Sequence, residues 1–154
     1  MLRTKKQGLL IVISGPSGAG KGTICAELLK RNNNLWKSVS MTTRKPRVGE
    51  KEGTDYFFVS KEEFTKSIKE NGFLEHATYA DEFYGTPRKY VLEHLNRGED
   101  VILEIEIQGA LQIKDVYSQG LFIFILPPSM KTLKRRLENR GTKKKEKVLK
   151  RFKR

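Results

Sequence analysis

The first residues whose types and spacing could do chemistry form a glycine-rich turn, Gly15-Pro-Ser-Gly-Ala-Gly-Lys21. An apolar run from Leu9 to Ile13 precedes this turn, and a stretch with helical spacing from Lys21 to about Arg31 follows it. In such a turn successive backbone N–H groups point at one anion, and the helix N-terminus adds its partial positive charge. The pattern therefore predicts a phosphate-binding loop, in which Lys21 reaches the outer phosphates of a nucleotide.

One position departs from the usual pattern of such a loop. The lysine is normally followed by Ser or Thr, whose hydroxyl holds Mg²⁺. Gly22 takes that place and the hydroxyl comes one residue later, at Thr23, so either Thr23 or only water completes the magnesium shell. The residues predicted to bind the nucleotide are Gly15, Pro16, Ser17, Gly18, Ala19, Gly20, Lys21, Gly22 and Thr23.

Three apolar runs predict the strands that must position the loop. Leu9–Ile13 is the unbroken stretch expected of a strand buried on both faces of a parallel sheet, and Val101–Ile105 and Leu121–Leu126 are predicted as a second and a third core strand. Helical stretches alternate with them, including Pro87 to Arg97 and Ser129 to Asn139. This alternation predicts a doubly wound α/β fold.

The region from Trp36 to about Tyr84 has a different pattern, which indicates an insertion beside the main sheet. Short strand-like pieces, Ser38–Ser40 and Tyr56–Val59, lie among turns that contain Gly and Pro. A helix is expected from Lys61 to about Asn71, with Ser60 as the first residue of a capping box.

Length and cysteine content limit the alternatives. The 154 residues are enough for one domain with a sizeable core. No apolar run is long enough to span a bilayer, and no signal-peptide core follows the basic start. The single cysteine, Cys25, excludes an internal disulfide and fits a reducing compartment, so we expect a cytoplasmic protein without membrane contact.

The formal net charge of +13 is a feature of the C-terminal part. Lys131–Arg154 holds 13 basic and 2 acidic residues, whereas the preceding part holds 18 and 16. A basic tail often signals nucleic acid, but clustered arginines also suit an enzyme that closes over polyphosphates. Phe152 is the only aromatic residue of the tail, so base stacking is poorly supported.

A longer string, Ser38-Val-Ser-Met-Thr-Thr-Arg-Lys-Pro-Arg47, is the first of several motifs that follow one another along the chain. The others are Gly49-Glu50, Gly53–Ser60, Phe73–Glu75, Tyr84–Pro87, Ile105–Gly109, Pro127–Ser129 and Arg135–Thr142. With these motifs in one register over essentially its whole length, the chain resembles the guanylate kinase family. The resemblance implies a P-loop enzyme that moves the γ-phosphoryl group of ATP onto GMP, with Mg²⁺ as cofactor and no nucleic acid as partner.

The resemblance also implies how the single domain, residues 1–154, is divided. The core would span 1–36 and 86–135, a GMP-binding insertion 37–85, and a helical lid 136–154. Relatives continue past the position of Arg151 for some tens of residues, with a further strand and a closing helix. We therefore expect an incomplete lid, weak ATP binding and reduced stability, in a monomer or a homodimer paired along an open sheet edge.

Four residues would bind the phosphate of GMP by the same resemblance: Arg44, Arg47, Tyr56 and Tyr84. Two guanidinium groups and two phenol donors suit a dianionic phosphate. From the residues alone, solvated loop arginines and core tyrosines would be an equally good interpretation.

The guanine base would be read by Ser40, Glu75, Thr86 and Glu106. Guanine presents N1–H and an amino group side by side, and the single carboxylate of Glu75 can accept from both. Adenine would present an acceptor to that carboxylate, and sites that pair polar groups discriminate by about 10⁴-fold or more. The alternative for Glu75 is an exposed glutamate at a helix end.

Glu104 and Glu106 lie on one face at the end of a predicted core strand, where ligands bind in open α/β sheets. Many relatives carry aspartate at both positions, so the longer side chains displace the charge. Glu104 is predicted to act on the magnesium shell, directly or through water. The alternative is an ion pair with a neighbouring lysine.

The catalytic residues implied by the resemblance are Lys21 and three lid arginines, Arg136, Arg140 and Arg151. Phosphoryl transfer asks the protein mainly for positioning and charge neutralisation. Arg136 and Arg140 share one helical face, as a common target requires. A solvated basic face is the alternative, and we prefer it for Lys143–Lys145.

Three other functions stay open. Another monophosphate kinase, such as adenylate kinase, shares Gly-Lys-Gly-Thr but not the string from Ser38 to Arg47. A guanylate-kinase-like binding module with weak or no catalysis would keep the arginines and lose the loop, and the intact Gly20-Lys21 argues against it. A nucleic-acid binder would show binding that depends steeply on salt.

Overall fold

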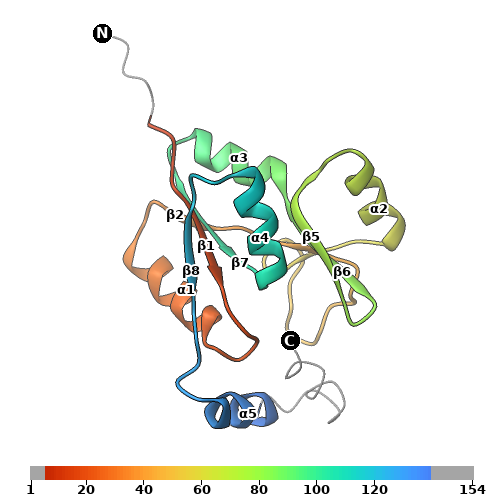
Figure 1. Cartoon of the computed structure of the whole chain (residues 1–154). Coiled ribbons are helices and arrows are strands. Elements are labelled where there is room, and N and C mark those ends of the chain that lie inside the picture. The colour runs from red at the N-terminus through yellow and green to blue at the C-terminus, as the bar shows by residue number, and fades with distance from the viewer. Residues whose placement is uncertain (1–5, 140–154) are drawn as a thin grey trace.

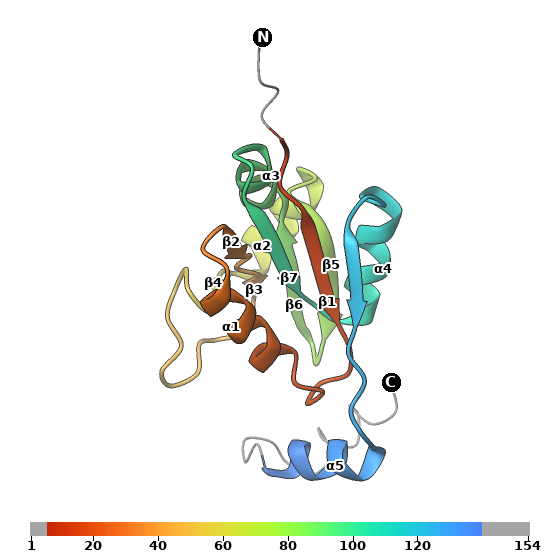
Figure 2. The same ribbon diagram turned by 90° about the vertical axis from the view of Figure 1, so that its left-hand side faces the viewer.

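A computed structural model of the chain describes residues 6–139, which form two sheets and five helices. The elements, labelled between them in Figure 1 and Figure 2, follow the order β1 (Leu10–Ser14), α1 (Lys21–Arg31), β2 (Leu35–Lys37), β3 (Met41–Thr42), β4 (Phe57–Phe58), α2 (Lys61–Lys69), β5 (Phe73–Tyr79), β6 (Glu82–Pro87), α3 (Arg88–Asn96), β7 (Asp100–Glu104), α4 (Ile107–Val116), β8 (Leu121–Phe124) and α5 (Met130–Asn139). The strand orders are β2-β7-β1-β8 in the main sheet and β4-β3-β6-β5 in the second. None of the helices in this part of the chain is long and apolar enough to cross a membrane.

The main sheet is parallel throughout, and helices cover both of its faces. Alternate residues of each strand point to opposite faces. Leu10 and Val12 lie in the core beneath α3 and α4, whereas Ile13 packs with Ile102 and with Cys25 of α1. Figure 2 shows α1 on one side of this sheet and α4 on the other. The predicted α/β fold with a parallel sheet is confirmed.

The last strand, β8, differs from its prediction in burial. It pairs in parallel with β1, as a strand of this sheet should. Within residues 6–139 it has no partner on its other side, and Leu121, Ile123 and Phe124 are 47%, 38% and 49% exposed. The strand predicted here exists, but it lies at the edge of the described sheet rather than in its core, because an apolar run alone does not separate the centre of a sheet from its edge.

The second sheet contains a hairpin that the sequence did not predict. β5 and β6 pair antiparallel around Ala80 and Asp81, whose φ angles are 51° and 67°. This turn lacks the Asn-Gly or Asp-Gly sequence that usually marks such a hairpin. The strand predicted at Ser38–Ser40 was also wrong, because the chain leaves the main sheet there: β2 ends at Lys37 and β3 begins at Met41.

The helix α2 begins as predicted. The backbone N–H of Glu63 donates to Ser60 Oγ at 3.1 Å, and the backbone N–H of Ser60 donates to the Glu63 carboxylate at 2.8 Å, which confirms the capping box. Phe64 of this helix is fully buried against Phe73 and Phe83. These ring contacts fix the β5–β6 hairpin, which carries Glu75, Tyr84 and Thr86.

Candidate active site

A cavity of about 340 Å³ is bordered by the loop after β1, the end of β7 and the second sheet. The predicted site residues that line it are Ser17, Gly18, Gly20, Lys21, Gly22, Ser40, Arg44, Arg47, Tyr56, Glu75, Tyr84, Glu104 and Glu106. The predicted residues that do not line it are Gly15, Pro16, Ala19, Thr23, Thr86 and Arg136. Arg140 and Arg151 lie outside the described residues. Residues predicted for two nucleotides thus share one space.

The loop after β1 has the features of an anion site. Gly20 precedes α1 with a φ of 103°, and no described side chain caps the first N–H groups of this helix, so they are available to a ligand. Lys21 is buried, and its Nζ donates to the carbonyl oxygens of Gly15 at 2.5 Å and Pro16 at 3.2 Å. Its ammonium group is therefore held within the turn. Thr23, in contrast, is exposed on the helix surface.

The helix α5 lies below this loop (Figure 2) and contacts it through Arg136. The Nη1 of Arg136 donates to the carbonyl oxygens of Gly18 at 3.3 Å and Ala19 at 3.5 Å. Leu133 and Leu137 of the same helix are buried and would meet any side chain at Gly18 at 3.2 and 3.3 Å. Arg136 thus touches the backbone of the loop rather than the cavity.

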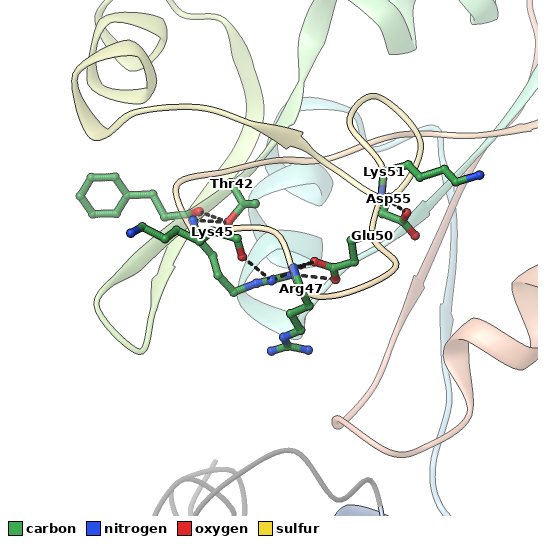
Figure 3. A network of polar contacts seen from close by, with 8 residues as sticks. Thr42, Lys45, Arg47, Glu50, Lys51 and Asp55 are labelled. Carbon is green, nitrogen blue, oxygen red and sulfur yellow. Dashed lines mark hydrogen bonds and ion pairs between the residues drawn. The ribbon is translucent and has the colours of Figure 1, made fainter.

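Arg44 is fixed by the carboxylate of Glu50, a residue that was not predicted to have a role. Arg44 Nη1 and Nη2 donate to the two oxygens of Glu50 at 3.0 and 2.9 Å, and Nη1 also donates to the carbonyl of Lys45 at 2.8 Å. The backbone N–H of Arg47 donates to Glu50 as well, at 2.7 Å, while Figure 3 shows the Arg47 guanidinium extending away. The hydrogen bond from Arg44 is the main reason that the pKa of Glu50 is lowered.

The geometry of this ion pair decides which edge of Arg44 stays open. A guanidinium has five N–H donors in one plane. Three of them bind Glu50 and the Lys45 carbonyl, and the remaining donors, on Nε and Nη2, lie side by side on the other edge. Such an edge suits two oxygens of one phosphate. The Tyr56 ring lies 5.3 Å from the Arg44 guanidinium carbon and limits its movement further.

Tyr56 and Tyr84 meet beside Arg44 with their ring centroids 6.2 Å apart. Burial raises the pKa of Tyr56, and the nearby Tyr84 adds to this effect. The phenol of Tyr56 therefore keeps its proton at neutral pH and can donate a hydrogen bond to an anion.

Glu75 is buried, with 6% of its surface exposed, and lies in a strand of the hairpin. The Thr86 hydroxyl of the neighbouring strand donates to Glu75 Oε1 at 2.6 Å. Burial raises the pKa of this carboxyl, and the hydrogen bonds from Thr86, which favour the charged form, do not offset it. An exposed glutamate at a helix end, the alternative interpretation, is thereby excluded.

Gly109 of α4 provides the space for the Glu75 carboxylate. A Cβ added at Gly109 would lie 2.9 Å from the Glu75 carboxyl carbon, closer than real side chains approach. Gly109 is the third residue of α4, so the carboxylate lies at the N-terminus of that helix, where the backbone favours negative charge. The other predicted acid, Glu106, is the N-cap residue of α4 and lines the cavity.

Glu104 pairs with Lys37 inside the cavity, as the alternative interpretation expected. Lys37 Nζ donates to Glu104 Oε2 at 2.5 Å, and both side chains line the cavity. Burial acts to lower the pKa of Lys37, but the hydrogen bond and the charge of Glu104 outweigh it, so the pKa is raised. The other oxygen of the carboxylate, Oε1, lies 3.5 Å from the Cβ position of Gly22. Glu104 thus links Lys37 to the phosphate-binding loop.

Three residues with a part in this geometry were missed by the sequence interpretation. Glu50 stood in a quoted motif, Gly49-Glu50, but received no role, and Gly109 closed another motif. Lys37 had no signal of its own beyond its place before Ser38. Each acts through a contact with a residue that the sequence did single out.

Two further features concern the single cysteine and the possible metal ligands. Cys25 is fully buried, and burial is the main reason that the pKa of its thiol is raised, so it is a core residue. Among residues 6–139, no three His, Cys, Asp or Glu side chains gather as a metal site.

Comparison with known proteins places the whole arrangement in one family. The sequence profile of the guanylate kinase family matches residues 7–154. A guanylate kinase from Clostridium tetani is 62% identical over 148 residues, which are 96% of this chain and 71% of that protein. One from Caldanaerobacter subterraneus is 58% identical over 149 residues, 97% of this chain and 72% of that protein.

A solved structure shares the fold. The crystal structure of guanylate kinase from Anaplasma phagocytophilum matches with a TM-score of 0.74 and 40% sequence identity, over 89% of this chain and 69% of that chain.

Proposed function

This chain belongs to the guanylate kinase family, and from that premise we propose how its residues move a phosphoryl group. The protein is an ATP:GMP phosphotransferase, a nucleoside monophosphate kinase that converts ATP and GMP to ADP and GDP. The observation that carries the assignment of residues is the single cavity onto which Lys21, Arg44 and Glu75 all open. In-line transfer needs donor and acceptor phosphates side by side.

On the donor side, the loop from Gly15 to Thr23 binds the phosphates of ATP. The N–H groups at the start of α1 and the ammonium of Lys21 supply positive charge where charge develops during transfer. Arg136 supports the loop from α5. Arg140 and Arg151, in the proposed lid of residues 136–154, neutralise the remaining negative charge of the phosphates.

On the acceptor side, the insertion, residues 37–85, binds GMP. Arg44 offers two parallel donors to its phosphate, and Arg47, Tyr56 and Tyr84 offer the others. Ser40, Glu75, Thr86 and Glu106 select guanine, with Thr86 holding one oxygen of Glu75 and thus fixing the carboxylate plane. The core, residues 1–36 and 86–135, carries both sites.

Guanylate kinases act on ATP with a divalent metal, and we propose Mg²⁺ in this chain. Carboxylate oxygens suit this ion, and Glu104 Oε1 lies beside Gly22, the position whose usual hydroxyl is missing. Thr23 is the second predicted contributor, although its side chain does not line the cavity. When bound, the ion neutralises charge between the outer phosphates.

We also propose where the protein is located and how it assembles. The buried, unreactive Cys25 suits the cytoplasm. A monomer, or a homodimer paired along the open edge of β8, would be distinguished by size at several protein concentrations. ATP and GMP are the partners, and no nucleic acid is needed.

One assay tests the proposed selection and the catalytic competence together. The protein receives ATP and Mg²⁺ with either GMP or AMP, and ADP release is followed. We expect release with GMP to exceed release with AMP by about 10²-fold or more. Equal rates would overturn the guanine assignment, and GMP binding without ADP release would favour the binding module.

Glu50→Gln should weaken GMP binding about tenfold without changing the affinity for guanosine, which lacks the phosphate. The amide accepts only one of the two Arg44 hydrogen bonds, so the open edge of Arg44 is no longer fixed. Asp55→Asn is the matched control, because Asp55 lines the same cavity but its carboxylate accepts only from the backbone N–H of Lys51 among the described contacts (Figure 3). Calorimetric titration with both ligands measures the effect, and an equal loss for guanosine would contradict it.

Gly109→Ala should raise the KM for GMP by about tenfold or more while leaving thermal stability unchanged or higher. The added methyl group must displace the Glu75 carboxylate, which is the movable end of a side chain. Replacing glycine within a helix favours folding by up to about 1 kcal/mol. Steady-state kinetics and a thermal melt give the two results, with ATP affinity as the internal control. An unchanged KM would show that Glu75 does not need this space.

A further inference from the structure

The ion pair between Lys37 and Glu104 is more than a link between two strand ends. β2 and β7 pair in parallel with Lys37 opposite Ile102, so Lys37 and Glu104 lie on the same face of the sheet. Their side chains are 40% and 23% exposed, and both line the cavity rather than the outer surface. An ordinary surface pair contributes little, but this one lies where the phosphates of two nucleotides must meet.

The two oxygens of Glu104 have different surroundings. Oε2 accepts the hydrogen bond of Lys37 at 2.5 Å. Oε1 lies 3.5 Å from the Cβ position of Gly22, the residue that follows the lysine of the phosphate-binding loop. Gly22 stands where a metal-binding hydroxyl is usual, and Oε1 of Glu104 lies beside it. The ion pair between Lys37 and Oε2 turns Oε1 toward Gly22.

We propose that Lys37 is a positioning residue for the metal site: it holds Oε2 of Glu104 so that Oε1 faces Gly22 and takes the place of the hydroxyl that Gly22 lacks. The proposal rests on the proposed function of Glu104 at the metal shell. Residues that orient a metal ligand from behind commonly change metal affinity by about 10- to 100-fold. Lys37 acts in this way although it is itself a cation, because it occupies the oxygen that points away from the loop.

The test measures the thermodynamic coupling between the binding of Mg²⁺ and the binding of the nucleotide. For each variant, the affinity for a non-hydrolysable ATP analogue is measured by calorimetry with Mg²⁺ and again with EDTA, and the ratio of the two dissociation constants is the metal coupling. The ratio removes the general loss of one positive charge near the phosphates, which weakens binding in both conditions. No step of catalysis enters this measurement.

Lys37→Met keeps the unbranched stem and removes the charge, and we expect it to lower the coupling about tenfold. Glu104→Gln should lower it by at least as much. Lys37→Arg restores a cation at the same oxygen and should return the coupling to near the original value. Because Lys37 acts through Glu104, the double variant Lys37→Met, Glu104→Gln should match Glu104→Gln alone.

Each other result has a definite meaning. A coupling that rises in Lys37→Met would show that Lys37 competes with the metal, and the proposal would be overturned. An unchanged coupling in Lys37→Met beside a lowered one in Glu104→Gln would overturn the role of Lys37 and keep that of Glu104. If Glu104→Gln also leaves the coupling unchanged, the proposed metal role of Glu104 fails first. Thermal melts of all variants establish that each one is folded.

Discussion

Lys21→Met should lower the rate of phosphoryl transfer by about 10²–10³-fold and leave the affinity for GMP unchanged. The ammonium of Lys21 is held in place before any substrate binds, by the carbonyl oxygens of Gly15 and Pro16. A charge fixed in advance stabilises the transition state without a cost for reorientation, and this charge lies on the donor side of the cavity. The residues proposed to bind GMP lie in or beside the second sheet, apart from Glu106 at the start of α4, and should not sense the loss of this charge.

Methionine is the suitable replacement because Lys21 is buried. The methionine side chain fills most of the buried space that the lysine stem occupies, so the substitution removes the charge without leaving a cavity. Lys30→Met is the matched control: it removes a lysine of the same helix that is exposed and bound to Glu27. Single-turnover transfer and GMP titration measure the two quantities. If Lys21→Met transfers the phosphoryl group at the original rate, the proposed role of the phosphate-binding loop in the transfer is wrong.

The parts of the fold that could be predicted are those whose signals are local. The helix α1 was predicted from about Lys21 to Arg31 and is observed over Lys21–Arg31, because the glycine-rich turn before it and Asn32 after it mark its two ends. The capping box of Ser60 and Glu63 is likewise contained within four consecutive residues. Both patterns depend only on residues that are close together in the sequence, so they can be identified without knowing which distant segments are in contact.

The parts that could not be predicted depend on contacts between distant segments. Glu75 reads as an ordinary polar residue in the sequence, and it is buried only because a hairpin and the Gly109 position of α4 enclose it. Lys37 and Glu104 are 67 positions apart and meet only when β2 and β7 pair. Motifs therefore indicated which side chains face the cavity, but not which groups hold them there.

Glu75→Gln should lower kcat/KM for GMP by about 10²-fold or more, with little change in the affinity for ATP. The carboxylate can accept from both guanine donors, N1–H and the amino group. The amide accepts from one, while its own NH₂ opposes the other inside a buried site. Glu70→Gln is the control, since that glutamate is exposed and pairs only with Lys66 at 3.8 Å among the described contacts. A raised KM for ATP with an unchanged KM for GMP would show that Glu75 was misassigned.

The same substitution should leave the protein equally stable or more stable at neutral pH, which separates selection from folding. Burial raises the pKa of Glu75 above its ordinary value of 4.5, so the folded state binds this proton more tightly than the unfolded state does. The free energy of unfolding therefore falls as the pH rises above the ordinary pKa toward the raised one, which is the cost of ionising the buried carboxylate. Glutamine carries no such cost. The melting temperature of Glu75→Gln, relative to the original protein, should consequently be highest near pH 7 and decline toward pH 4. If Glu75→Gln melts at a lower temperature than the original protein at pH 7, the charged carboxylate stabilises the fold. In that case the guanine-binding carboxylate of Glu75 does not lower the stability of the protein.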